Sequence, residues 1–364
     1  MQTTVPKPSV PIETQPRMVG RHKLLRRTVA GLLIVSGILA TAYAGTAVLC
    51  AIVLTHPTHV PVTETPAKYG LTFHDVAFES RVDHLKLRGW FIPGVLSNGQ
   101  LTATRTIIMV PGKDDNRTDP TLGLLELSAN FTQRGFAVLS FDLRGHGQSA
   151  PAAFSFGQFE QRDVLGAVDF LSSGPLPYPE LGRPQAIVGW GISTGGTSLL
   201  LAAAQEPRIQ AIVTDTAFAE VLPILEREIP YAGQSESEPR IAVLPSALTP
   251  GILRTTQLLY GIDYDAIRPL DAATKLAPRP VLFVHGITEP LVPFSDMEKL
   301  ARAARSAPNA QVEEWLVPGI VEHAQAYHVM GITYLNRVAS FFSAALGTSV
   351  SPAASVGTQS QGRN

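Results

Sequence analysis

The chain has 364 residues, a formal net charge of −1, and 45% hydrophobic against 16% charged residues. This composition allows a large buried core, and the near-zero charge argues against nucleic-acid binding, which needs a broad basic surface. The single cysteine, Cys50, excludes an internal disulfide framework and a thiolate metal cluster.

The N-terminal region predicts a membrane anchor. Residues 1–28 are basic and rich in proline, so we expect a disordered cytoplasmic segment. Residues 29–54 then run without a charge. As a helix they would extend over ~39 Å, enough to cross a ~30 Å hydrocarbon core. Because the basic flank precedes this span, the positive-inside rule predicts a cytoplasmic N-terminus and an extracytoplasmic domain.

A cleavable signal peptide is the alternative for the same region. The tripeptide Ala-Tyr-Ala at 42–44 resembles a small-x-small cleavage site, and cleavage there would release a secreted protein. The apolar run continues beyond this site to Leu54, which favours the anchor.

After a linker at residues 55–65, the segment 66–346 alternates strand-like and helix-like stretches. Alternating apolar and polar residues at 74–80 and 84–92 indicate a half-buried hairpin. Buried strands are predicted at 104–110, 136–142, 185–191, 209–218, 280–286 and 312–319, and helices at 124–135, 158–173, 197–205 and 334–346. This order predicts an α/β fold with a mainly parallel, doubly wound sheet and helices on both faces.

Two further segments depart from this pattern. Residues 219–275 mix short helical stretches with proline and glycine, and we expect a small lid insertion over the site, with a loose structural crossover as the alternative. The tail at 347–364 is rich in serine, alanine, glycine and glutamine and is expected to be disordered.

The sequence Gly-Ile-Ser-Thr-Gly at 191–195 fits the pattern G-x-S-x-G. It follows an apolar strand and precedes a helical stretch, as the pattern requires. In that context Ser193 would project from a tight turn at a helix N-terminus, where free N–H groups stabilise negative charge. We therefore expect Ser193 to be a nucleophile.

A serine nucleophile needs a base, and the base needs a carboxylate. His323 follows the last predicted strand, with His328 as its main rival. Glu289 follows the strand at 280–286 and is the favoured acid, and Asp215 after the preceding strand is the alternative acid. The chain order serine, acid, histidine is that of the α/β-hydrolases.

These motifs give a resemblance over residues 66–346 to the α/β-hydrolase superfamily, in its bacterial esterase/lipase-like and serine aminopeptidase-like branch. The segments "FDLRGHGQS" (141–149), "GWGISTGG" (189–196), "HGITEPLVP" (285–293) and "HAQAY" (323–327) carry it. The resemblance implies that His146 is a structural loop residue. It also implies an oxyanion hole, for which the backbone N–H groups of Lys113 and Thr194 are the candidates.

The chain departs from the family pattern at two positions. Glu289 stands where aspartate is usual, and Pro111 stands where relatives usually have a histidine in the oxyanion loop. A glutamate can still orient a histidine, and an oxyanion hole depends on backbone groups rather than on that side chain.

The expected activity is hydrolysis of carboxylic esters through Ser193, His323 and Glu289 with an acyl-enzyme intermediate, on a small-molecule or lipid-like acyl substrate. No metal or organic cofactor is expected. An amide or peptide hydrolase would use the same residues and is the first alternative. A non-catalytic, membrane-tethered binding domain on a degenerate hydrolase fold is the second.

Overall fold

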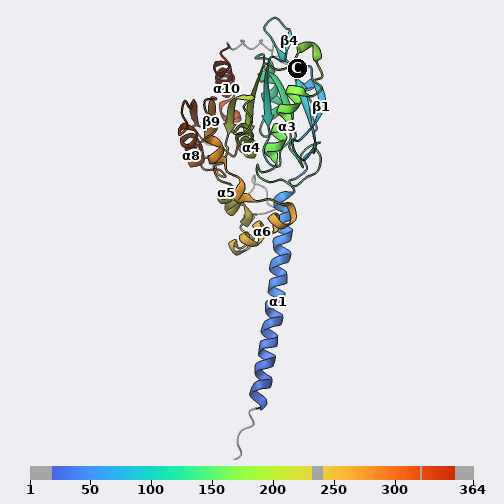
Figure 1. Ribbon diagram of the computed structural model, residues 1–364, viewed down its shortest axis with the longest axis vertical. Helices are drawn as coiled ribbons and strands as arrows, with labels where there is room; N and C mark the ends of the chain where they lie inside the picture. Colours follow the sequence, from blue (N-terminus) through green and yellow to red (C-terminus); the bar gives the residue numbers. More distant parts are fainter. Residues whose placement is uncertain (1–18, 232–240, 320–321, 349–364) are drawn as a thin grey trace, which may run out of the picture.

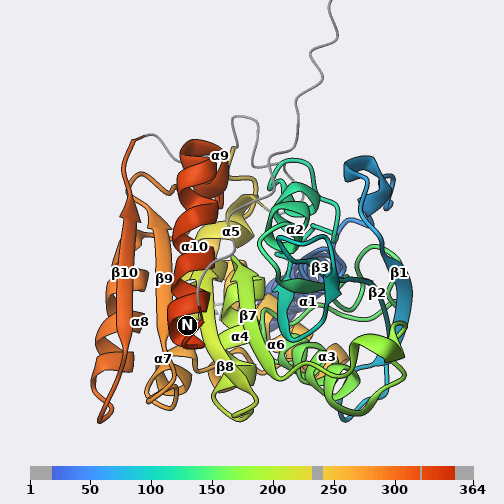
Figure 2. The same cartoon turned by 90° about the horizontal axis from the view of Figure 1, so that it is seen from above.

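The computed structural model describes residues 19–231, 241–319 and 322–348. An eight-stranded sheet forms the centre of the domain, in the order β1-β2-β6-β5-β7-β8-β9-β10. Figure 2 shows these strands crossing the molecule from β10 at the left to β1 at the right. The strands are β1 (His74–Glu79), β2 (Lys86–Ile92), β5 (Arg105–Val110), β6 (Ala137–Phe141), β7 (Ala186–Ile192), β8 (Ile209–Asp215), β9 (Val281–Gly286) and β10 (Val312–Val317).

The sheet is mainly parallel, as the sequence predicts. β1 pairs antiparallel with β2, and β2 pairs antiparallel with β6. The pairs from β6 through β5, β7, β8 and β9 to β10 are all parallel. A small hairpin of β3 (Gly94–Val95) and β4 (Leu101–Thr102) was not expected from the sequence.

Helices cover both faces of the sheet, because parallel strands bury apolar side chains on each side. Alternate residues of β7 show this: Ile187 belongs to one apolar cluster and Val188 to the other. The first cluster contains side chains of α3 (Glu160–Ser173), α4 (Thr194–Ala203), α7 (Pro269–Ala273) and α8 (Phe294–Arg305). The second contains side chains of α2 (Leu124–Thr132), α9 (Ala326–Met330) and α10 (Ile332–Ala345).

Helix α1 (Val19–Thr55) extends away from the domain as a single long rod (Figure 1). It begins ten residues before Val29, the expected start of the anchor. Residues 19–28 are therefore helical, whereas the sequence led us to expect disorder there. The chain has no proline between Pro16 and Pro57, so nothing interrupts the helix there. Residues 1–18 lie outside the described part.

The apolar surface of α1 is largely exposed, for example at Leu32 (63%), Leu33 (68%) and Leu39 (64%). Between Lys23 and Thr55 the helix is long and apolar enough to cross a membrane, a property that an anchor shares with a signal sequence. A row of exposed large apolar side chains is unfavourable in water, so this surface indicates a lipid or protein environment.

The insertion at 219–275 consists of short helices beside the end of α1, and its residues 232–240 lie outside the described part. A third apolar cluster joins the insertion to Ala47, Cys50 and Ala51 of α1. The helical segments of the insertion are α5 (Val221–Glu228), η3 (Ile229–Tyr231), η4 (Ser246–Leu248), α6 (Thr249–Tyr260), η5 (Tyr264–Ala266) and α7. Outside it lie two single turns, η1 (Pro66–Tyr69) and η2 (Pro179–Leu181). Of the expected tail, residues 349–364 lie outside the described part.

The end of α1 is bonded to the edge of the sheet at which β5 and β7 end. The Phe154 amide donates to the Thr55 carbonyl at 2.8 Å. Three residues later, the Thr58 amide donates to Asp114 Oδ1 at 2.7 Å, in the loop that follows β5. Because Asp114 lies in the loop that follows the carboxyl end of β5, α1 leaves the domain on the side at which the parallel strands end.

Candidate active site

Ser193 is the only residue between β7, which ends at Ile192, and α4, which begins at Thr194. Its backbone has φ 52° and ψ −125°, a conformation that is costly for a residue with a side chain. The Ser193 amide donates to the Asp215 carbonyl at 2.8 Å, which helps to hold this turn. The structure thus places Ser193 on the sharp strand-to-helix turn that the sequence predicts.

Glycines make the turn possible by allowing backbone segments to approach. A Cβ at Gly195 would lie 2.1 Å from the Pro111 carbonyl oxygen, and one at Gly191 would lie 2.7 Å from the Gly195 carbonyl oxygen. Any larger residue would push the loop after β5 away from Ser193. The position of that loop therefore depends on the missing side chain at Gly195.

His323 lies in the loop between β10 and α9, directly against the serine. Its Nε2 is 3.0 Å from Ser193 Oγ, and its Nδ1 is 2.8 Å from Glu289 Oε1. Because a carboxylate can only accept, the proton of the neutral ring lies on Nδ1. Nε2 is then the acceptor for the Ser193 hydroxyl, which is the arrangement a general base requires.

Glu289 follows β9, and its residue is only 8% exposed. The amides of Ala324 and Leu291 donate to its two carboxylate oxygens at 3.1 and 2.9 Å. Burial alone would raise the pKa of Glu289, but His323 and these amides together hold it below its ordinary value. The carboxylate is therefore ionised at neutral pH and fixed in position beside His323.

Asp215, the alternative acid, makes different contacts. Its Oδ2 accepts from the Tyr334 hydroxyl at 2.8 Å, and its Oδ1 accepts from Thr216 Oγ1 at 3.0 Å. Trp190 Nε1 in turn donates to the Tyr334 hydroxyl at 3.0 Å. Complete burial raises the pKa of Asp215 to about 6. These contacts tie Asp215 into the core beneath the turn rather than to His323.

The rival histidine, His328, lies in α9 and is not next to Ser193. Its ring contacts Tyr327 at a centroid distance of 5.5 Å. The ring carbon Cε1 lies 3.5 Å from the position of a Cβ at Gly123, on the helix α2 side. The structure thus brings His323, and not His328, to the serine.

The loop after β5 carries the candidate oxyanion donor Lys113. A Cβ at the preceding Gly112 would lie 3.5 Å from the Ser193 Cβ, so this backbone runs beside Ser193. The other candidate donor, the Thr194 amide, belongs to the first turn of α4, where N–H groups have no partner within the helix. Both candidate donors therefore belong to segments that lie next to Ser193.

His146 supports this loop, in agreement with the structural loop role that the resemblance implies for it. Its Nδ1 bonds to the Arg144 carbonyl at 2.8 Å, and its Nε2 accepts from the Asp114 amide at 3.1 Å. Burial lowers the pKa of His146 to about 4, so the ring is neutral and can accept. The sequence does not identify its partner, the Asp114 amide, because the two residues lie 32 positions apart.

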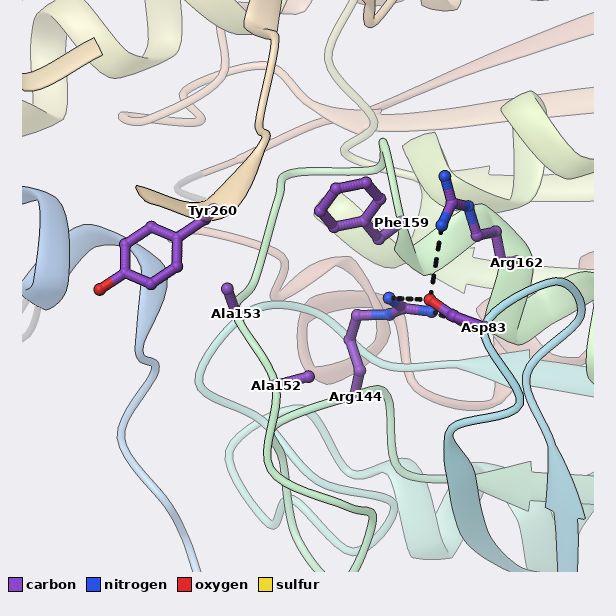
Figure 3. Close-up of a pocket in the computed structure, with 7 residues that line it drawn as sticks. All are labelled: Asp83, Arg144, Ala152, Ala153, Phe159, Arg162 and Tyr260. Atoms are coloured by element: carbon purple, nitrogen blue, oxygen red, sulfur yellow. Dashed lines mark hydrogen bonds and ion pairs between the residues drawn. The ribbon is translucent and has the colours of Figure 1, made fainter. Parts of the chain in front are cut away.

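A surface pocket of about 230 Å³ lies elsewhere on the domain (Figure 3). Arg144 lines it, and its guanidinium bonds to Asp83 at 2.8 Å. Arg162 also approaches Asp83, at 3.5 Å. Because these charges are paired with each other and Ser193 is not among the lining residues, the pocket is no substitute for the site at the turn.

The part of the chain that the structure describes contains no group of three or more histidine, cysteine, aspartate or glutamate side chains arranged to hold a metal ion. The chemistry that the described site can perform is nucleophilic attack by a serine assisted by a histidine and a carboxylate.

Comparison with known proteins identifies sequence relatives. The model of the alpha/beta hydrolase family matches residues 107–339. The uncharacterized protein YfhR of Escherichia coli O157:H7 is 26% identical over 267 residues, which cover 72% of this chain and 78% of that protein. The serine hydrolase BPHL of Homo sapiens is 30% identical over 184 residues, which cover 45% of this chain and 57% of BPHL.

Solved structures show the same architecture. The esterase Pf2001 of Pyrococcus furiosus has a TM-score of 0.61 at 22% identity, covering 79% of this chain and 98% of the esterase. Est1E from Butyrivibrio proteoclasticus, solved with ferulic acid bound, has a TM-score of 0.52 at 19% identity, covering 75% of this chain and all of that one (100%). At these identities the likeness establishes the fold.

Proposed function

This chain belongs to the alpha/beta hydrolase family, and on that premise we propose that it is a serine hydrolase that cleaves carboxylic esters through Ser193, His323 and Glu289. The observation that carries the proposal is the continuous hydrogen-bonded series of these three side chains, at 3.0 and 2.8 Å. Esterases among its structural neighbours support the choice of an ester as substrate.

In the first half of the reaction, Ser193 Oγ attacks the ester carbonyl carbon while His323 Nε2 takes the hydroxyl proton. Glu289 stabilises the imidazolium that results, since its carboxylate is ionised and bonded to Nδ1. The tetrahedral intermediate then collapses. The carbon–oxygen bond to the alcohol breaks, and the alcohol leaves with the proton from His323.

In the second half, water attacks the acyl-enzyme with His323 again as base, and the acid is released as Ser193 recovers its proton. In both halves negative charge develops on the carbonyl oxygen. The backbone amides of Lys113 and Thr194 are the donors we propose for this oxyanion. The positive end of the α4 dipole adds to the same stabilisation.

We place the protein at the cell membrane, with α1 as a single-pass anchor, a cytoplasmic N-terminus and an extracytoplasmic domain. The exposed apolar surface of α1 and the basic residues before its apolar run support this. A lipid-like acyl ester is a fitting substrate for a site beside such an anchor. Secretion after cleavage at 42–44 is the alternative.

The test is a substrate panel on the purified full chain in detergent. It compares p-nitrophenyl esters of increasing acyl length with aminoacyl-p-nitroanilides, with Ser193→Ala as the matched control. We expect ester cleavage by the wild type and none by the variant. Preference for the anilides would instead support the amide hydrolase, and inactivity of folded wild type on both classes would support a binding domain.

A further inference from the structure

We propose that the insertion makes a second contact with the membrane, and that residues 241–253 dip into the leaflet on the domain's side, next to α1. We call this stretch the apolar segment. The inference rests on the proposed anchoring of α1 in a bilayer, and the partner it commits to is the lipid of that same bilayer.

The composition of the apolar segment suits lipid. Its sequence, Ile-Ala-Val-Leu-Pro-Ser-Ala-Leu-Thr-Pro-Gly-Ile-Leu, contains no charged residue, and Arg254 follows it directly. Ile241 is 73% exposed and Val243 is 59% exposed. These two apolar side chains are separated by one residue, and exposed apolar side chains that lie together indicate an interaction site.

The position of the apolar segment along α1 is fixed by contacts at two levels. At the level far from the domain, the Tyr43 hydroxyl donates to the Ala247 carbonyl at 3.1 Å. At the level of the domain, the rings of His56 and Tyr260 are 5.3 Å apart. Helix α6 therefore lies beside α1 over about 20 Å, with the apolar segment at the end away from the domain, consistent with Figure 1.

The length of α1 gives an estimate of how deeply the apolar segment enters the bilayer. The last basic residue before the apolar run is Arg27. A hydrocarbon core of ~30 Å takes about 20 helical residues, which from Thr28 reaches the neighbourhood of Ala47. Tyr43 then lies about 6 Å inside the boundary, and its partner Ala247 lies there with it. This matches the insertion depth of interfacial segments, ~5–10 Å.

Helices α1 and α6 pack closely enough to form one membrane-facing unit. A Cβ at Gly251 would lie 2.5 Å from the Tyr43 hydroxyl oxygen, so the helices approach at a glycine. Ala47, Cys50 and Ala51 of α1 share an apolar cluster with Ile252 of α6. When α1 is in the bilayer, the apolar segment cannot be held away from lipid without breaking this packing.

The arrangement also gives the substrate class a physical basis. The same apolar cluster reaches Val292, three residues after Glu289. The segment after α1 bonds to the oxyanion loop through Thr58 and Asp114. The active-site edge is thus on the side of the domain from which α1 enters the proposed leaflet, which suits an amphiphilic ester drawn from that leaflet by its acyl chain.

Site-directed fluorescence in lipid nanodiscs tests the inference on the full chain. Cys50→Ala removes the native thiol, and Val243→Cys then receives an NBD label. Ser97→Cys is the matched control, since Ser97 is exposed and lies in the β3–β4 hairpin, at the end of the domain opposite α1 (Figure 1). We expect the label at 243 to be blue-shifted, quenched by nitroxide-labelled lipid and protected from iodide. The label at 97 should show no blue shift, no nitroxide quenching and full quenching by iodide.

Iodide quenching at 243 equal to that at 97 would overturn the inference. A blue shift without nitroxide quenching would overturn it too, because it would indicate a protein partner or a second copy instead of lipid. Fluorophosphonate labelling of Ser193 in the same samples reports the catalytic proposal separately. Failure of one readout with success of the other therefore shows which of the two proposals is wrong.

Discussion

At the scale of single residues, the sequence pointed to the serine and the histidine and, through the family resemblance, favoured Glu289 as the acid with Asp215 as the alternative. Nothing in the spacing of the chain could separate Glu289 from Asp215, because both follow buried strands. The distinction depends on contacts between distant segments. Glu289 bonds to His323 at 2.8 Å, whereas the Asp215 carboxylate accepts a hydrogen bond from the Tyr334 hydroxyl, 119 residues later in the chain. Glutamate fits where aspartate is usual because amides at 291 and 324 hold its carboxylate.

The assignment of the acid can be checked by removing each charge separately. Glu289→Gln should lower kcat by roughly 10³–10⁴-fold, since the ring then loses its orienting carboxylate and its preferred tautomer. Asp215→Asn should cost about tenfold or less, because the amide oxygen can still accept from Tyr334. The measurement is kcat on a p-nitrophenyl ester for both variants. A larger loss for Asp215→Asn would reverse the assignment.

His146 should make stability depend on pH. Its pKa is about 4 in the folded protein against 6.5 for the free ring. The unfolded chain therefore binds more protons between these values, and the free energy of unfolding falls as the pH drops through this window, by up to about 3 kcal/mol. Above pH 6.5 the contribution is fully present.

The check compares the thermal midpoint of wild type and His146→Gln at pH 7 and pH 5. The thermal midpoint of wild type should fall more between pH 7 and pH 5 than that of the variant, because the glutamine does not titrate. The pKa of Asp215, raised to about 6, makes the free energy of unfolding rise as the pH falls, which is the opposite effect. Asp215 is present in both proteins, so its effect cancels in the comparison. Equal losses would show that His146 is not buried as a neutral acceptor.

At the scale of elements, the strands and helices of the core could be predicted well, because their apolar periodicity is local. The strand predicted at 280–286, for example, is observed at Val281–Gly286. The early start of α1 and the β3–β4 hairpin were missed, since neither has a strong periodic signal. The turn at Ser193 was recognisable because its glycines are required by backbone contacts, with Gly195 against Pro111 as the tightest.

Gly195→Ala tests that contact. The added methyl group would lie 2.1 Å from the Pro111 carbonyl oxygen, so the oxyanion loop must shift and stability should fall by about 1–3 kcal/mol. Labelling of Ser193 should fall as well. Gly37→Ala is the control, because no atom lies within 4 Å of that position. If Ser193 of the Gly195→Ala variant were labelled as strongly as in wild type, the loop would be able to move without affecting the serine.

At the scale of the whole molecule, α1 and the candidate active site are joined by direct contacts, which the sequence could not reveal. The linker at 55–65 reads as a simple tether, yet Asn116 Nδ2 donates to the Val60 carbonyl at 3.0 Å and Thr58 bonds to Asp114. Likewise, the insertion was expected to be a cover for the site, and nothing local indicated that α6 packs along α1. Such contacts join segments far apart in the chain, so no pattern within either segment encodes them.

This coupling predicts that α1 stays attached. Cleavage after Ala44 would remove Tyr43, whose hydroxyl bonds to Ala247 of the insertion. We expect the chain isolated from membranes to retain an N-terminal epitope tag and the full-length mass. A mature N-terminus at Gly45 in the culture medium would contradict the anchor and support secretion.

The most direct test of the central claim is fluorophosphonate labelling of the full chain in its membrane fraction, beside Ser193→Ala and His323→Ala. An activated serine reacts only with its base in place, so we predict labelling of wild type at Ser193, mapped by peptide mass, and loss of labelling in both variants. Folded wild type that remains unlabelled, or that is labelled at another serine, would contradict the assignment of Ser193, His323 and Glu289 as a hydrolase site.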